Sequence, residues 1–129
     1  MEGEKAMYGP ALLRVFLGIL FIIPGIGKLL DIGGPTGLLV GLGFPAPAFF
    51  AWVLALSEVI FGLSVLLGWK VKWTVWPLVI VLTVATLLVV IPNMNGNPVT
   101  LLFHLVGIAG LISLALTGPG AMAVSKEQM

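Results

Sequence analysis

Residues 47–68 constrain the fold more than any other stretch of this chain. The run is apolar almost throughout, yet it carries one carboxylate, Glu58, at its centre. As a helix it is about 33 Å long, enough to cross a hydrocarbon layer about 30 Å thick. A charge at that depth costs about 2.5–3.5 kcal/mol on insertion scales, which the surrounding Leu, Ile, Val and Phe residues offset. We therefore expect Glu58 to face protein and to have a partner.

The composition also indicates a membrane protein. Of the 129 residues, 60% are hydrophobic and only 9% are charged, against about 25% charged in an ordinary soluble domain. The net charge is +1 with no basic cluster, which argues against a nucleic-acid partner. The chain has no cysteine, and this excludes disulfides, thiol catalysis and Cys-ligated metal or iron–sulfur centres. With a single histidine as well, we expect no metal site.

Three further apolar stretches are long enough to span a bilayer, and polar or glycine-rich turns separate them. The four expected spans are residues 11–30, 47–68, 74–91 and 99–117. The prediction is a single all-α domain, a polytopic transmembrane four-helix bundle, followed by a mobile tail at residues 118–129. Residues 31–46 are rich in Gly and Pro and too short to span, so they are predicted to form an amphipathic or re-entrant segment at the membrane interface.

Small residues mark one face of each of the first two spans, and small residues let a neighbouring helix approach closely. Helical spacings of 4, 3, 4 and 3 place one stripe on a single face of the first span: Arg14, Gly18, Phe21, Gly25 and Lys28. A second stripe surrounds Glu58: Ala51, Ala55, Gly62 and Val65. These two faces are expected to point into the bundle.

The basic residues indicate the orientation. With four spans, the amino tail, the second turn and the carboxyl tail lie on one side of the membrane. That side holds most of the cations: Lys5, Arg14, Lys70, Lys72 and Lys126. By the positive-inside bias we expect a multi-pass protein of the plasma membrane with both termini in the cytoplasm. An acidic leader and a poor cleavage site argue against a signal peptide, so the first span is expected to stay uncleaved.

Four polar side chains inside the spans are candidates for a ligand-binding site or an ion pair. Helical rise places Arg14 about 6 Å and Glu58 about 15 Å from the cytoplasmic edge, so an ion pair between them is feasible. Such a pair can serve architecture alone, or it can bind a proton or ligand. Snorkelling to the headgroups is the competing expectation for Arg14 and the favoured one for Lys28. His104 lies near the outer edge, as Lys28 does, and is expected to be a hydrogen-bonding packing residue rather than a metal ligand.

The first half of the chain carries several recognisable motifs. They are an early Arg14, a Gly-x-Gly-Lys at residues 25–28, a Gly-Leu-Gly-Phe-Pro-Ala-Pro linker at residues 41–47, and Glu58 followed by Gly62. In this order they resemble the DoxX family of small four-helix membrane proteins, whereas the third and fourth spans match it only in hydropathy. The resemblance implies an accessory membrane partner of a redox or oxidative-stress enzyme. The family takes its name from a subunit of a terminal-quinol or thiosulfate:quinone oxidoreductase system, which makes quinone the candidate cofactor.

Three functions stay open. The first is an accessory subunit of a membrane redox system with a polar pocket around Glu58 that binds quinone or lipid. There Glu58 accepts a proton, Arg14 holds its charge, and His104 or Lys28 hydrogen-bonds a carbonyl head group. The second is a non-enzymatic anchor or assembly protein, and the third is a small-molecule or lipid transporter, for which four short spans leave little room unless the chain oligomerises. The residues do not decide whether the chain is an enzyme.

Overall fold

The computed structural model describes residues 2–120, so most of the expected mobile tail lies outside the described residues. Over that range the chain is helical and contains no strand, which confirms the all-α prediction. The helices are α1 (Glu2–Leu30), α2 (Gly33–Gly41), α3 (Pro47–Leu67), α4 (Val71–Ala85), a π-helix η1 that continues α4 (Thr86–Val90), and α5 (Val99–Thr117). Four stretches are long and apolar enough to cross a membrane: Tyr8–Leu30, Pro47–Leu67, Val71–Val90 and Val99–Thr117.

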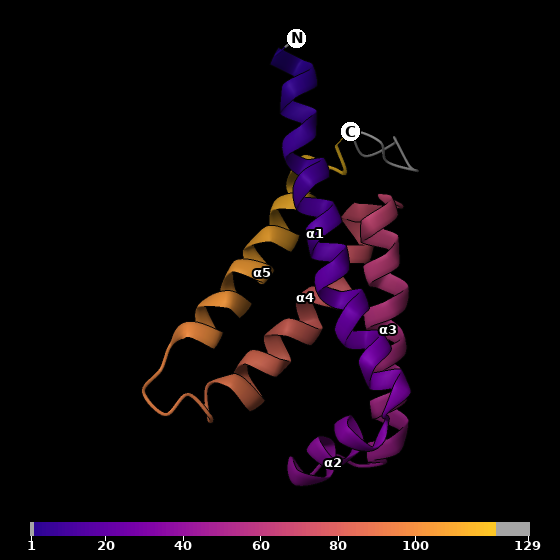
Figure 1. Cartoon of the computed structure of the whole chain (residues 1–129), viewed down its shortest axis with the longest axis vertical. Helices are drawn as coiled ribbons and strands as arrows, with labels where there is room; N and C mark the ends of the chain where they lie inside the picture. Colours follow the sequence, from indigo (N-terminus) through magenta and orange to yellow (C-terminus); the bar gives the residue numbers. More distant parts are fainter. Residues whose placement is uncertain (1, 121–129) are drawn as a thin grey trace.

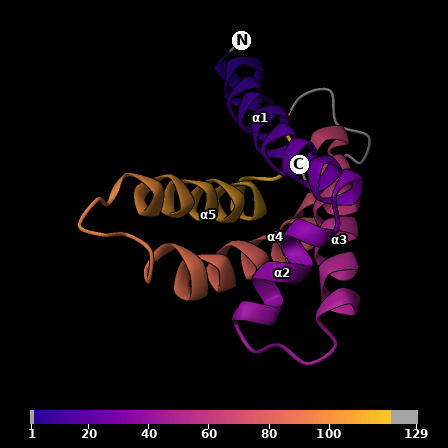
Figure 2. The ribbon, with the colours of Figure 1, turned by 60° about the horizontal axis from the view of Figure 1, so that its bottom comes forward.

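The four long helices form two antiparallel hairpins. Helices α1 and α3 lie side by side, and α4 lies beside α5 (Figure 1). The hairpins meet at the end that holds the α3–α4 turn and diverge toward the end that holds α2, as both views show (Figure 2). The start of α1, the α3–α4 turn and the end of α5 therefore lie at one end of the molecule. We call this the closed end, and the opposite end the open end.

A cluster of buried side chains joins the two hairpins toward the closed end. All four long helices contribute to it: Leu17, Phe21, Val65, Val71, Val75, Leu78, Leu111 and Leu114. The turn between α3 and α4 is sharp because Gly68 adopts a left-handed conformation, with φ at 75°. There the N–H of Trp69 donates to the carbonyl of Ser64, and the N–H of Gly68 donates to that of Val65, a Schellman ending that caps α3. This packing fixes the hairpins at one end and leaves them apart at the other.

Helices α1 and α3 pack through the two stripes that the sequence indicates. On α1, Arg14, Gly18, Phe21 and Gly25 are buried. The buried residues of α3 are those of its predicted stripe: Ala51, Ala55, Glu58, Gly62 and Val65. The prediction of the inward faces is confirmed for both helices. The start of α1 differs from the prediction, because the helix begins at Glu2 and not near residue 10.

Helix α2 lies across the open end and packs against α3 (Figures 1 and 2). Its buried residues are Pro35 and Leu39, while Leu38 and Val40 are exposed. Apolar side chains on both faces make α2 a poor amphipathic helix. Its place at the end of the bundle matches the prediction of a short segment outside the spans, but its composition suits apolar surroundings on both sides.

Candidate functional site

An ion pair joins the first two spans near the middle of α3. The Nζ atom of Lys28 lies 2.8 Å from both carboxylate oxygens of Glu58. The Glu58 side chain is 6% exposed and that of Lys28 is 29% exposed. The prediction that Glu58 faces protein and has a basic partner is confirmed. The expectation that Lys28 snorkels to the nearer membrane edge is wrong.

The direction in which helical side chains lean explains why Lys28 turns inward. Side chains on a helix point toward its N-terminus. Lys28 is in the last turn of α1, so it leans back toward the middle of the bundle. Glu58 leans toward the N-terminus of α3, and because α3 runs antiparallel to α1, this is the end from which Lys28 approaches. The two side chains therefore lean toward each other.

Arg14 does not form the ion pair with Glu58 that the sequence made feasible. Its Nη1 atom donates a hydrogen bond to the backbone carbonyl of Leu66. Leu66 lies eight residues beyond Glu58, about 12 Å farther along the helix, so the structure does not form the Arg14–Glu58 pair, and Lys28 takes that place. Arg14 is 3% exposed, which also rules out the snorkelling alternative. A cation at the last turn of α3 complements the carbonyl groups that end a helix.

A groove between the two hairpins, with a cavity volume of about 270 Å³, contains the ion pair. Lys28 and Glu58 line it from α1 and α3, and His104 lines it from α5. Apolar side chains from α1 and α4 form most of the remaining wall: Leu20, Phe21, Pro24, Val81, Leu82 and Ala85. The structure thus brings three of the four predicted polar residues together and leaves Arg14 nearer the closed end.

His104 has a defined hydrogen-bonding state. Its Nδ1 atom lies 2.9 Å from the backbone carbonyl of Thr100. A carbonyl only accepts, so Nδ1 carries the hydrogen, and in the neutral ring Nε2 is then an acceptor. This confirms His104 as a hydrogen-bonding residue. In the part of the chain that the structure describes, no three His, Cys, Asp or Glu side chains cluster as metal ligands would.

Pro24 removes one helical hydrogen bond from α1 where that helix lines the groove. Proline has no N–H, so it cannot donate the helical hydrogen bond to the carbonyl four residues earlier. That carbonyl belongs to Leu20, which lines the groove beside Pro24. Sequence reasoning did not place Pro24 in the groove, because its place there depends on how the helices pack against one another.

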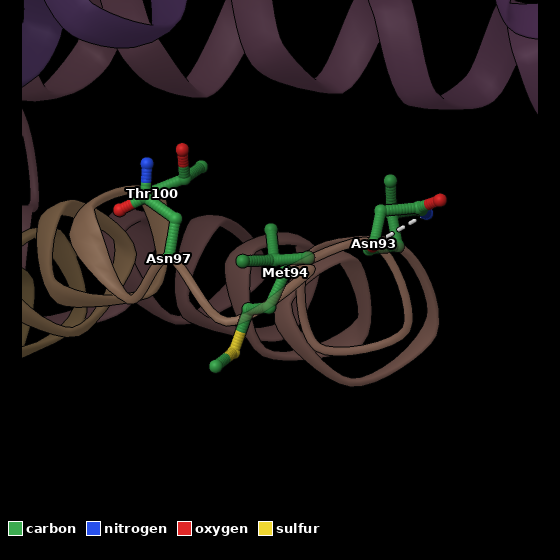
Figure 3. Close-up of a pocket in the computed structure, with 6 residues that line it drawn as sticks. Asn93, Met94, Asn97 and Thr100 are labelled. Carbon is green, nitrogen blue, oxygen red and sulfur yellow. Dashed lines mark hydrogen bonds between the residues drawn. The ribbon is translucent and has the colours of Figure 1, made fainter.

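A second cavity, of about 290 Å³, lies at the α4–α5 turn. Asn93, Met94, Asn97 and Thr100 line it (Figure 3). The Asn93 side chain donates to the carbonyl of Val89 at 2.7 Å, and Asn97 Oδ1 accepts from a backbone N–H of α5 at 3.1 Å. These amides shape the turn, and no charged side chain lines the cavity. The groove with the ion pair is therefore the stronger candidate site.

A family model describes most of this architecture. The DoxX family model matches residues 9–91, which is more than half of the chain. The chain belongs to the DoxX family. The match includes Arg14, Lys28 and Glu58 and extends through the third span, beyond the first half in which the motifs are evident. His104 lies outside the matched range, and no curated protein or solved structure matches the chain.

Proposed function

We propose that this DoxX protein is an accessory subunit of a membrane redox system and that its groove binds the head group of a quinone. The observation that carries the proposal is the meeting of Lys28, Glu58 and His104 in one groove whose other walls are apolar. Ligand sites typically combine an apolar lining with a few convergent polar groups. Ionisable residues within membrane spans are rare and mark functional pathways.

The groove offers the groups that quinone chemistry requires. Lys28 can donate a hydrogen bond to a quinone oxygen, and Glu58 and His104 can each accept a proton when a quinol is oxidised. These residues handle protons and hydrogen bonds, so we assign the electrons to a partner redox enzyme. Arg14 supports the site indirectly, because its bond to Leu66 helps to hold α3 against α1.

The proposal predicts that Glu58→Gln weakens quinone binding by about three- to tenfold, the equivalent of one hydrogen bond. The amide keeps the size of the side chain but brings its own N–H donors toward the Lys28 ammonium. The repulsion between these donors displaces the Lys28 ammonium, which is the group that donates to a quinone oxygen. Binding of a quinone with a ten-carbon tail is measured by titration of the purified protein in lipid nanodiscs. Lys70→Gln is the control, because Lys70 lies in the α3–α4 turn at the closed end. Equal affinity of Glu58→Gln and the wild type would count against the proposal.

We also propose that the closed end faces the cytoplasm and that the protein lies in the plasma membrane. Lys70 and Lys72 are exposed near the α3–α4 turn, and the Lys70 Nζ lies 5.2 Å from the centre of the Trp69 ring. Basic and aromatic residues at one membrane edge are typical of a cytoplasmic interface.

The native chain has no cysteine, which permits a direct test of this orientation. Lys70→Cys and Asn95→Cys are a matched pair, because both positions are exposed and left-handed, with φ at 48° and 51°. An impermeant thiol reagent is expected to label Asn95→Cys on intact cells and Lys70→Cys only after permeabilisation. The opposite pattern would reverse the proposed orientation.

A further inference from the structure

The walls of the groove present opposite hydrogen-bonding groups. On the α1 and α3 wall, the Lys28 ammonium has three N–H groups. Two of them donate to the two carboxylate oxygens of Glu58, each at 2.8 Å. Among the described residues, these are the hydrogen bonds of the Lys28 ammonium. The third N–H is left to donate, and the Lys28 side chain is exposed enough, at 29%, to present it to a ligand.

The facing wall, on α5, presents an acceptor. The Thr100 carbonyl fixes the hydrogen of His104 on Nδ1, so Nε2 carries a lone pair. Flipping the tautomer would set a lone pair against the Thr100 carbonyl oxygen, which is repulsive.

We infer that the groove selects the reduced, hydroxyl-bearing form of its ligand, an aromatic diol on an apolar tail, over the oxidised dicarbonyl form. This inference rests on the proposed function and adds to it the form that binds. A diol head has two hydroxyls that both accept and donate, so one accepts from Lys28 while the other donates to His104 Nε2. A dicarbonyl head only accepts, and its second oxygen would meet the lone pair of His104.

The charge of the groove further limits which head groups it can bind. Lys28 and Glu58 together are neutral, so the groove has no net charge with which to attract an ionic head. A carboxylate head, as in a fatty acid, would bring a second negative charge beside Glu58, and like charges in a medium of low dielectric constant repel strongly. A neutral head that forms hydrogen bonds avoids this cost.

The volume of the groove agrees with a single ring. At about 270 Å³ it lies just below the range of about 300–1,000 Å³ for pockets that hold drug-sized ligands. Phe103 lines the groove from α5 and is 71% exposed, so an apolar surface continues from the polar centre toward the lipid. The head group occupies the groove, and the tail lies along this surface.

The test compares one molecule in its two oxidation states, a benzoquinone with a ten-carbon tail and its quinol, under anaerobic conditions in lipid nanodiscs. The quinol is expected to bind the wild type about tenfold more tightly than the quinone, the equivalent of one hydrogen bond that only the quinol forms. His104→Leu is expected to bind both forms with the same affinity. Decanoic acid, as the carboxylate probe, is expected to bind more weakly than either.

Nuclear magnetic resonance of the wild type tests the inference without a substitution. Because the chain has one histidine, ¹⁵N-histidine labelling reports His104 alone. The expected spectrum has a protonated Nδ1 and a lone-pair Nε2, and the Nε2 signal shifts on addition of quinol but not of quinone. Failure of both forms to bind would overturn the proposed function and this inference together. Binding without preference, a preference that survives in His104→Leu, or a protonated Nε2 in the unliganded protein would overturn this inference alone.

Discussion

Replacing Lys28 by methionine is expected to destabilise the protein by about 3 kcal/mol, because it leaves the buried Glu58 carboxylate without its cation. Glu58 is nearly enclosed, and both of its oxygens contact the Lys28 ammonium. Methionine keeps the length and apolar contacts of the lysine stem, so the change isolates the charge. The measurement is denaturant unfolding in detergent micelles, followed by circular dichroism.

The matching double substitution separates charge from packing. Replacing a whole buried ion pair with apolar residues of similar size is often neutral or even stabilising. Lys28→Met combined with Glu58→Leu is therefore expected to recover most of the stability that Lys28→Met loses. Lys70→Met controls for the loss of a lysine, because Lys70 is exposed at the α3–α4 turn. Glu58→Leu alone completes the cycle. If the effects of Lys28→Met and Glu58→Leu simply add in the double variant, the residues are not energetically coupled and the pair does not stabilise the fold.

The partner of Glu58 shows what sequence reasoning can predict and where it stops. Hydropathy and helix length fix the depth of Glu58, and the cost of a charge at that depth requires a partner. The choice between Arg14 and Lys28 depends on the lean of side chains and on the register of two antiparallel helices. Depth measured from one membrane edge favoured Arg14, but the lean of the side chains toward their N-termini favours Lys28.

The composition of the groove depends on the order of helices around the bundle, which periodicity does not contain. The stripe on α1 was predictable because its spacing alone defines a helix face. That α5 lies beside α1 was not predictable. In the structure, a Cβ atom added at Gly110 of α5 would lie 3.1 Å from Leu17 of α1. Because α5 packs beside α1, His104 lines the same groove as Lys28.

The π-helix η1, which continues α4, could not be predicted from the sequence either. In η1 the N–H of Ile91 donates to the carbonyl of Thr86 at 3.0 Å, a span of five residues. The Thr86 hydroxyl donates to the carbonyl of Leu82 at 2.6 Å. A threonine that bonds to the preceding turn is a weak signal of a bent helix, but it does not specify the widened turn.

Substitution of Gly18 by alanine is expected to destabilise the α1–α3 contact by about 1–3 kcal/mol, through overpacking of a closely packed interface. A Cβ atom at this position would lie 2.9 Å from the backbone carbonyl oxygen of Gly62 and 2.9 Å from the Cα of Leu66. Backbone atoms cannot rotate out of the way, so α1 and α3 must separate. Because Lys28 and Arg14 both bridge these helices, the same substitution is also expected to weaken the quinone binding that we propose for the groove.

Gly27 provides a matched control on the same helix. A Cβ atom there would meet nothing within 4 Å, so Gly27→Ala keeps the packing and gains helix propensity, worth up to about 1 kcal/mol. The two alanine substitutions therefore have opposite expected signs, and thermal unfolding of both variants in detergent measures the difference. If Gly18→Ala proves as stable as Gly27→Ala, this result would contradict the close packing of α1 against α3 at Gly18. The Lys28–Glu58 pair, which depends on the same helix register, would then lose its structural basis.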